Sequence, residues 1–489
     1  MHENITKKLA ALSTGVGLVL LCYMAYATIY GPYKTTFVHL AIFALCSFVA
    51  LFLDSITQNM ESKFGILKNS LLLVISVSVL GYFIIEFERL INLWGSTYLS
   101  SWDILLGGFF VIICIEASWR QSVVLGTLAI VACFYMLFGD YLPGIFSHAG
   151  MDFERFIYIV VYTSEGLFGT GLKVAATYLF MFIILGSVLR VTKTGDFMID
   201  MANGLLGSKV GGAAKGAMVA SAGLGTIVGS SIGNVLATGT FTIPLMKRTG
   251  FEPHVAAAVE TNTSEGAQLV PPILGASAFI MAQLTGIPYE VIALAAVVPA
   301  SLYYFSLYTV VHIEALKHNI SGLPDDEIPS IKKTFTRGWH LLVAPISLFY
   351  LLLIGSYTVT FASLIAIFTA VFFGLLRKHT RFTLKELIAF LSEGLSQSAR
   401  ITALVISIGL IQAAIVATGL GPRLTDIILD FSNGSLLMTA SLTVVAATVL
   451  GMGMPTPITY LLLAMFAAPA LIECGSTVLS AHLFLFYFA

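Results

Sequence analysis

Charged residues are scarce in this sequence. Only 10% of its 489 residues are Asp, Glu, Lys or Arg, whereas 57% are hydrophobic. Soluble domains carry roughly 25% charged residues, so a chain of this length could not hide so much apolar surface from water. Lipid must therefore surround much of it. The net charge of -1, with no run of basic residues, excludes nucleic acid as a partner.

Cysteine and catalytic motifs are also sparse. The five cysteines stand singly, with neither a CxxC pair nor a metal-ligand spacing. No P-loop, GxSxG or HExxH motif occurs, so we expect neither ATP hydrolysis nor an enzyme, and no cofactor beyond a coupling ion. Glu260 and Glu265 could form the acid–base pair of a membrane-embedded enzyme, but no nucleophile accompanies them. Energy for transport would then come from an ion gradient.

Apolar blocks long enough to cross a bilayer recur along the chain. About 20 residues are needed to span ~30 Å of hydrocarbon. Loops rich in Lys and Arg alternate with more acidic loops, which predicts a multi-pass protein with a cytoplasmic N-terminus. The amphipathic stretch 382–397 is expected to lie along the cytoplasmic interface as a separate helix. The expected spans, about 12 in all, lie near 10–30, 37–53, 70–86, 104–119, 121–138, 173–190, 255–287, 291–311, 339–356, 358–376, 398–418 and from about 476 onwards.

Two further apolar stretches have flanks of matching charge. The stretch 209–246 has Lys209 at one end and Lys247 at the other, whereas 435–472 lies between Asp430 and Glu473. Like charge at both ends places both ends on one side of the membrane. We therefore expect two re-entrant helical hairpins, which are tolerated only where protein or a water-filled cavity surrounds them.

An internal repeat supports this topology. Ser164-Glu165-Gly166-Leu167 recurs 228 residues later as Ser392-Glu393-Gly394-Leu395, and other matches follow in order at nearly the same offset. The copies begin from opposite sides of the membrane, as inverted-topology repeats do. The predicted division is a membrane scaffold at 1–150, a first repeat at 151–338, a connecting pair of spans at 339–382, and a second repeat at 383–489 whose last part is expected to be missing.

The first hairpin contains the densest cluster of small polar residues. Glycines there break the helix and free backbone carbonyls, while Ser and Asn add side-chain oxygens, a combination that suits a desolvated monovalent cation. Close helix packing through small residues is the alternative. The candidate ion or substrate ligands in this turn are Gly229, Ser230, Ser231 and Asn234.

A second polar run interrupts the apolar block at 255–287. Carboxylates at mid-membrane depth are costly unless they face a cavity, a cation or a proton. Glu265 lies among hydroxyls and is favoured as a site residue, whereas Glu260 is either a site residue or a structural link to a neighbouring helix. We expect this run to be unwound and to supply Thr261, Asn262, Thr263, Ser264, Glu265 and Gly266.

The second hairpin contributes Gly451, Gly453 and Thr456 to a comparable turn. Three segments then resemble one family. The run from Val228 to Gly250, the segment from Val259 to Pro272 and the sequence Gly451-Met-Gly-Met-Pro-Thr456 are similar to the large membrane subunit of tripartite ATP-independent periplasmic (TRAP) transporters. The N-terminal spans would then be the small subunit, fused ahead of the large one.

The resemblance implies an all-α polytopic protein with an inverted-repeat, elevator-type architecture. It implies a sodium-coupled importer of organic acids (carboxylates) in a bacterial or archaeal inner membrane, fed by an extracytoplasmic binding protein of the TAXI type. Sodium would be held at Ser231, Asn234 and Thr263. Glu265 departs from the small or hydroxyl residue expected in the family. A proton-coupled carboxylate transporter, and an ion channel or exchanger without a binding protein, remain the alternatives.

Overall fold

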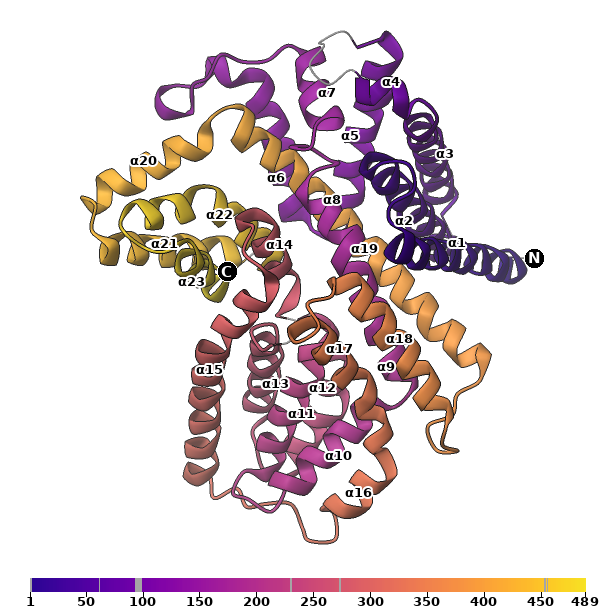
Figure 1. Cartoon of the computed structure of the whole chain (residues 1–489), viewed down its shortest axis with the longest axis vertical. Helices are drawn as coiled ribbons and strands as arrows, with labels where there is room; N and C mark the ends of the chain where they lie inside the picture. Colours follow the sequence, from indigo (N-terminus) through magenta and orange to yellow (C-terminus); the bar gives the residue numbers. More distant parts are fainter. Residues whose placement is uncertain are drawn as a thin grey trace. The chain divides into compact units, whose positions relative to one another are not determined.

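The computed structural model describes residues 2–60, 62–92, 99–228, 231–271, 274–452, 454 and 456–489, and these contain helices and no strand (Figure 1). Ten of the described helices are long and apolar enough to cross a bilayer. The chain is therefore an all-helical, multi-pass membrane protein, as the composition predicts. It divides into two compact units, unit 1 (Met1–Phe180, Gln283–Thr285, Leu395–Ala489) and unit 2 (Met181–Ala282, Gly286–Gly394).

Unit 1 contains the N-terminal helices and the C-terminal part of the chain. Its N-terminal helices pack around stacked and edge-on aromatic rings, with Phe83 in contact with Phe110, Tyr162 and Phe168. Its helices are α1 (His2–Tyr30), α2 (Thr36–Gln58), α3 (Lys63–Ile85), α4 (Phe87–Asn92), α5 (Ser101–Gln121), α6 (Val123–Phe138), α7 (Phe153–Tyr162), α8 (Thr170–Val174), the later part of α19 (Leu384–Ala417), α20 (Leu420–Ser432), α21 (Leu436–Gly451), α22 (Thr456–Glu473) and α23 (Val478–Phe488).

Polar side chains join the N-terminal helices of unit 1 to α19. The Asp54 carboxylate accepts hydrogen bonds from Ser13 at 2.7 Å and from Ser396 at 2.6 Å. Ser407 donates to Ser118 at 2.8 Å. Such hydrogen bonds between apolar helices specify which faces meet, because lipid-exposed helices gain little from hydrophobic burial alone.

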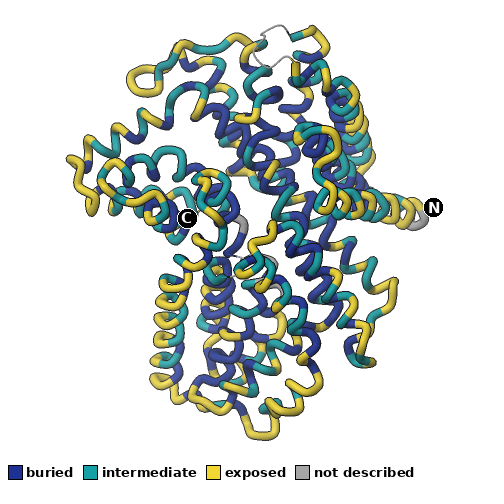
Figure 2. The backbone as a smooth tube through the Cα atoms, viewed as in Figure 1, coloured by how far each residue is buried: buried dark blue, intermediate teal, exposed yellow. Residues whose placement is uncertain are grey.

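Unit 2 holds the first hairpin and its neighbours. Buried residues of this unit recur along α11, α12 and α13 (Figure 2). Its helices are α9 (Phe180–Val191), α10 (Thr194–Leu206), α11 (Gly212–Val228), α12 (Ser231–Arg248), α13 (Pro253–Ala267), α14 (Gly275–Thr285), α15 (Tyr289–Lys317), α16 (Ile331–Gly338), α17 (Val343–Leu353), α18 (Val359–Leu375) and the first part of α19.

The predicted unwinding of Thr261–Gly266 is wrong, because α13 remains helical as far as Ala267. Its polar side chains bond back onto their own helix: Thr261 donates to the Ala257 carbonyl at 2.9 Å and Thr263 to the Val259 carbonyl at 2.7 Å. Such back-bonding satisfies a hydroxyl without breaking the helix. The interruption of the expected span 255–287 lies further along, between Ala267 and Gly275, where Pro271 cannot donate a helical hydrogen bond.

A second correction concerns the expected interfacial helix at 382–397. Residues Leu384–Ala417 form one continuous helix that includes both this stretch and the expected span 398–418. Thr383 and Glu386 cap its start reciprocally, with Thr383 N donating to Glu386 Oε2 at 2.6 Å and Glu386 N to Thr383 Oγ1 at 3.2 Å. No proline lies inside it, so nothing interrupts the helix before Gly419, which takes a left-handed conformation.

The two expected hairpins correspond to the pairs α11–α12 and α21–α22, and within each pair the helices pack against each other. Helices α10 to α12 have 13, 17 and 18 residues, and α20 to α22 have 13, 16 and 18. This recurrence of helix order and length agrees with the sequence repeat. The re-entrant course of the hairpins and the opposite orientation of the repeats remain predictions.

Candidate functional site

Three helices of unit 2 each present polar or small residues at a spacing of four. Residues four apart lie on one face of a helix, so each helix directs such a stripe towards the others. The side chains that meet form a set that we call the Glu260 cluster. Its members are Ser221 on α11, Asn234, Thr238 and Thr242 on α12, and Glu260 and Ser264 on α13, all buried to within 1% exposure.

The Glu260 carboxylate lies at the centre of this cluster. Thr238 Oγ1 donates to Glu260 Oε1 at 2.5 Å, and Thr242 Oγ1 donates to Oε2 at 2.6 Å. The hydroxyls of Ser221 and Ser264 lie 3.3 and 3.2 Å from Oε1. Hydroxyls from all three helices thus converge on one carboxyl group.

Asn234 links the hairpin to α13. Its Nδ2 lies 2.9 Å from the Ser221 carbonyl, 2.8 Å from Ser221 Oγ and 3.2 Å from Ser264 Oγ. Its Oδ1 is buried and has no hydrogen-bond partner among the residues that the structure describes. A buried amide oxygen without a partner loses its hydration at a cost of about 1–3 kcal/mol, and an added cation or proton donor would satisfy it.

Glycines allow the helices to approach this closely. A Cβ on Gly225 would stand 2.1 Å from Ala267 Cβ and 2.8 Å from Asn234 Nδ2. A Cβ on Gly239 would stand 3.3 Å from Glu260 Cγ. The glycines of the hairpin therefore permit close helix packing, which was the alternative interpretation of its composition. The cation-binding interpretation remains a prediction.

No cationic side chain forms an ion pair with Glu260 within the described residues. The buried Lys215 on α11 contacts other groups: its Nζ lies 3.0 Å from His312 Nδ1 and 4.7 Å from the centre of the Tyr308 ring. A buried carboxylate without a countercharge either takes up a proton or attracts a mobile cation. The cluster is therefore suited to binding a monovalent cation or a proton.

The structure brings only some of the predicted site residues together. Asn234 and Ser264 belong to the Glu260 cluster. Thr261, Asn262 and Glu265 are exposed, and the Glu265 carboxylate accepts a hydrogen bond from Gln268 Nε2 at 2.8 Å. The buried Thr263 bonds to Val259, as described above, and Gly266 gives room to the ring of Tyr303, which a Cβ would meet at 2.2 Å.

The other predicted ligands lie elsewhere. Ser231 is the first residue of α12 and is half-buried, whereas Gly229, Ser230 and Gly453 lie outside the described residues. Gly451 ends α21 and Thr456 begins α22, both in unit 1. The proposed sodium ligation by Ser231, Asn234 and Thr263 remains a prediction.

Sequence reasoning missed Ser221, Thr238 and Thr242. The signal was nevertheless present, because 234, 238 and 242 are spaced by four within an apolar helix, as are 260 and 264. The described residues contain no group of three or more His, Cys, Asp or Glu side chains that could hold a transition metal. Most of the atoms in the Glu260 cluster that could bind a cation are oxygens, and hard cations prefer oxygen ligands.

Comparison with known proteins connects this site to a family. Residues 106–489 match the family model of the tripartite ATP-independent periplasmic transporter, DctM component. A Haemophilus influenzae protein named as a TRAP transporter large permease is 24% identical over 296 residues, which cover 60% of this chain and 68% of that protein. The family comprises secondary transporters that work with a dedicated solute-binding protein. The chain therefore belongs to the DctM family of TRAP transporter permeases, and it is a multi-pass membrane transport protein rather than an enzyme.

Proposed function

We propose that the chain is the permease of a sodium-coupled, binding-protein-dependent importer of organic acids that works by an elevator mechanism. The Glu260 cluster is the observation that supports ion coupling. Within the described part of unit 2, it offers a carboxylate without an ion-pair partner, surrounding hydroxyls and an Asn234 Oδ1 without a hydrogen-bond partner. A sodium ion among these oxygens would balance the buried charge and satisfy the amide oxygen together.

The energy of such coupling is sufficient for uptake. One charge that moves through 100 mV yields ~2.3 kcal/mol, so two sodium ions yield ~4.6 kcal/mol. That corresponds to roughly 10³-fold accumulation of a neutral solute before any sodium concentration gradient is added. No ATP-binding motif is required.

Coupling to protons is the second candidate, and the same carboxylate favours it. Glu260 has hydroxyls on both of its oxygens and could carry a proton between the two sides of the membrane. A hydroxyl both donates and accepts, so the cluster can hydrogen-bond the protonated and the ionised carboxyl group. The two candidates therefore differ in whether a sodium ion or a proton neutralises the negative charge of Glu260.

We propose that residues 1–150 act as the scaffold that the small subunit provides in unfused systems. The hydrogen bond of Ser396 to Asp54 supports this, since it joins the N-terminal helix α2 to α19. A TAXI-type binding protein would deliver the carboxylate substrate from outside, with the N-terminus of the permease in the cytoplasm. The binding-protein type follows from the sequence resemblance, and the cytoplasmic N-terminus follows from the distribution of Lys and Arg in the loops.

The test is uptake into proteoliposomes that contain the full-length permease, with its binding protein supplied outside. A sodium gradient without a pH gradient should drive accumulation of the carboxylate that the binding protein carries. If only a pH gradient drives accumulation, the coupling ion is the proton and not sodium. Ion flux without any binding protein or solute would instead indicate a channel or exchanger.

A further inference from the structure

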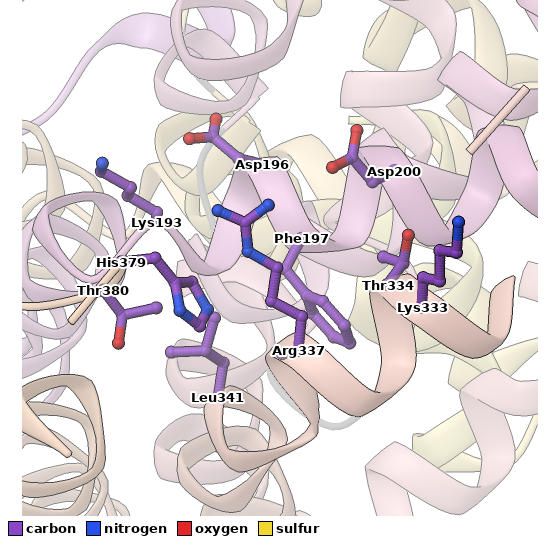
Figure 3. A pocket seen from close by; sticks show the side chains of 11 residues that line it. Lys193, Asp196, Phe197, Asp200, Lys333, Thr334, Arg337, Leu341, His379 and Thr380 are labelled. Atoms are coloured by element: carbon purple, nitrogen blue, oxygen red, sulfur yellow. The ribbon is translucent and has the colours of Figure 1, made fainter. Parts of the chain in front are cut away.

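A second polar site in unit 2 lies apart from the Glu260 cluster. It is a pocket of about 280 Å³ between α10, α16 and the loop that precedes α19, and we call it the mixed-charge pocket (Figure 3). Its charged or titratable lining residues are Lys193, Asp196, Asp200, Lys333, Arg337 and His379. The volume is at the lower end of the range for small-molecule sites.

The pocket lies where several membrane helices end. Lys193 follows the candidate span Thr170–Val191, Arg337 lies near the start of the candidate span Ile331–Leu353, and His379 follows α18. Segments that flank the ends of spans are at the depth of lipid headgroups. The excess of Lys and Arg indicates the cytoplasmic leaflet.

Helix α16 has the character of an interfacial helix. Ile331 and Phe335 on α16 and its C-cap residue Trp339 are spaced by four and are 40%, 48% and 47% exposed. Exposed apolar and aromatic residues on one face of a basic helix are typical of a segment that lies in the membrane surface. A phospholipid headgroup is therefore a ligand whose depth in the bilayer would match that of the pocket.

The pocket presents charge of both signs. Within the described residues, none of its charged groups forms an ion pair with another across the pocket. In Figure 3 the Arg337 guanidinium points into the pocket on the same side as the two aspartates, with Lys193 and His379 beside it. Burial and the neighbouring Asp196 carboxylate raise the pKa of Asp200, and the positive charge of Arg337 acts in the opposite direction.

We propose that the mixed-charge pocket binds the headgroup of a phospholipid that carries both a phosphate and a primary ammonium group, as phosphatidylethanolamine does. Arg337, Lys193 and Lys333 would hold the phosphate, because a guanidinium matches two phosphate oxygens at once. Asp196 and Asp200 would accept hydrogen bonds from the ammonium group. The acyl chains would remain in the bilayer.

The experiment titrates the purified full-length chain with lipids and follows bound lipid by native mass spectrometry. The lipids share palmitoyl and oleoyl chains and carry ethanolamine, choline or glycerol headgroups. Choline keeps the charge but cannot donate a hydrogen bond, and glycerol lacks the cation. The wild-type chain should bind one ethanolamine lipid more tightly than either of the others.

Two variants separate the parts of the site. The double variant Asp196→Asn, Asp200→Asn should bind the ethanolamine lipid about 2- to 30-fold more weakly, which is the range expected for the loss of two exposed ion pairs. Its affinity for the glycerol lipid should not change. Arg337→Gln should lower the affinity for the ethanolamine lipid and for the glycerol lipid by a similar factor. Asp325→Asn and Lys332→Gln, exposed changes of the same kind outside the pocket, should change neither.

Several results would overturn the proposal. Equal binding of the three lipids by the wild-type chain would do so, and this measurement needs no variant to fold. If the double variant loses binding of all three lipids equally, Asp196 and Asp200 do not recognise the ammonium group. Displacement of the lipid by soluble phosphoethanolamine at similar concentrations would identify a site for a water-soluble ligand. These lipid-binding measurements do not depend on transport, so their outcome is independent of the proposed function.

Discussion

Replacement of Glu260 by Gln tests the ion site directly. Gln keeps the size of the side chain and removes its charge. Its amide oxygen can still accept from Thr238, and its NH₂ group would face Thr242 Oγ1, now 2.6 Å from Glu260 Oε2. That hydroxyl can turn to accept instead of donate, so the fold should tolerate the change.

The expected magnitude follows from the loss of one charged ligand. Hydrogen bonds and ion contacts to a charged group contribute about 1.5–3 kcal/mol. If the Glu260 carboxylate binds sodium, the sodium concentration for half-maximal uptake should rise by about 10- to 140-fold. Under proton coupling, uptake should instead lose its dependence on the pH gradient.

Glu265→Gln provides the matched control. The same chemical change is made five residues further along α13, at an exposed carboxylate. Exposed ion contacts contribute about 0.2–1 kcal/mol, so the half-maximal concentration should change by less than about 5-fold. The assay is a sodium titration of uptake in proteoliposomes, with binding-protein capture and melting temperature measured for each variant.

The opposite outcome would refute this reasoning. If Glu265→Gln shifts the ion dependence and Glu260→Gln does not, then the exposed carboxylate is the coupling group and the buried cluster only joins helices. A fall in melting temperature for Glu260→Gln with an unchanged sodium curve would also assign Glu260 to structure. Unchanged ion dependence in both variants would place the site elsewhere.

Three further expectations follow from the same helices. Asn234→Leu should raise the sodium requirement of uptake without weakening binding-protein capture, because it removes the Oδ1 that no described residue contacts and the Nδ2 donor to Ser221. Weakened capture with an unchanged sodium curve would contradict this. Gly225→Ala should lower the free energy of unfolding by about 1–3 kcal/mol, because the added methyl group overpacks against α13. Gly223→Ala is the control: its Cβ would meet only the flexible end of Met198 at 3.1 Å, so the free energy of unfolding should change little. Thermal melting measures both. Cysteines at Lys209 and Lys247 should both react with an impermeant maleimide from the cytoplasmic side, and labelling from opposite sides would exclude a re-entrant hairpin.

Part of the site could be read from the sequence because its signals are local. Asn234 and Ser264 were found since they lie in runs of small polar residues within apolar surroundings. Thr238 and Thr242 were missed because α12 also carries other hydroxyls, such as Thr240, and the sequence alone does not mark which of them face α13. Such a residue becomes significant only when the helix face that carries it is known to meet a carboxylate.

The polar run on α13 shows why local reasoning also failed. Hydroxyls in a row suggest an unwound segment, but each can bond to the carbonyl four residues earlier and leave the helix intact, as Thr261 and Thr263 do. The break falls instead after Ala267, towards Pro271, where a backbone donor is missing. Side-chain polarity therefore did not predict helix breaking here, because α13 continues to Ala267, beyond the polar run.

The sequence by itself determined the solvent, the class and the family. Scarcity of charge over 489 residues requires lipid, and the hairpin motifs resemble TRAP permeases, in agreement with the family match over residues 106–489. Only the tertiary structure decided which carboxylate is buried. Glu260 and Glu265 differ by five residues, so they point to different sides of α13, and α11 and α12 cover only the side that carries Glu260.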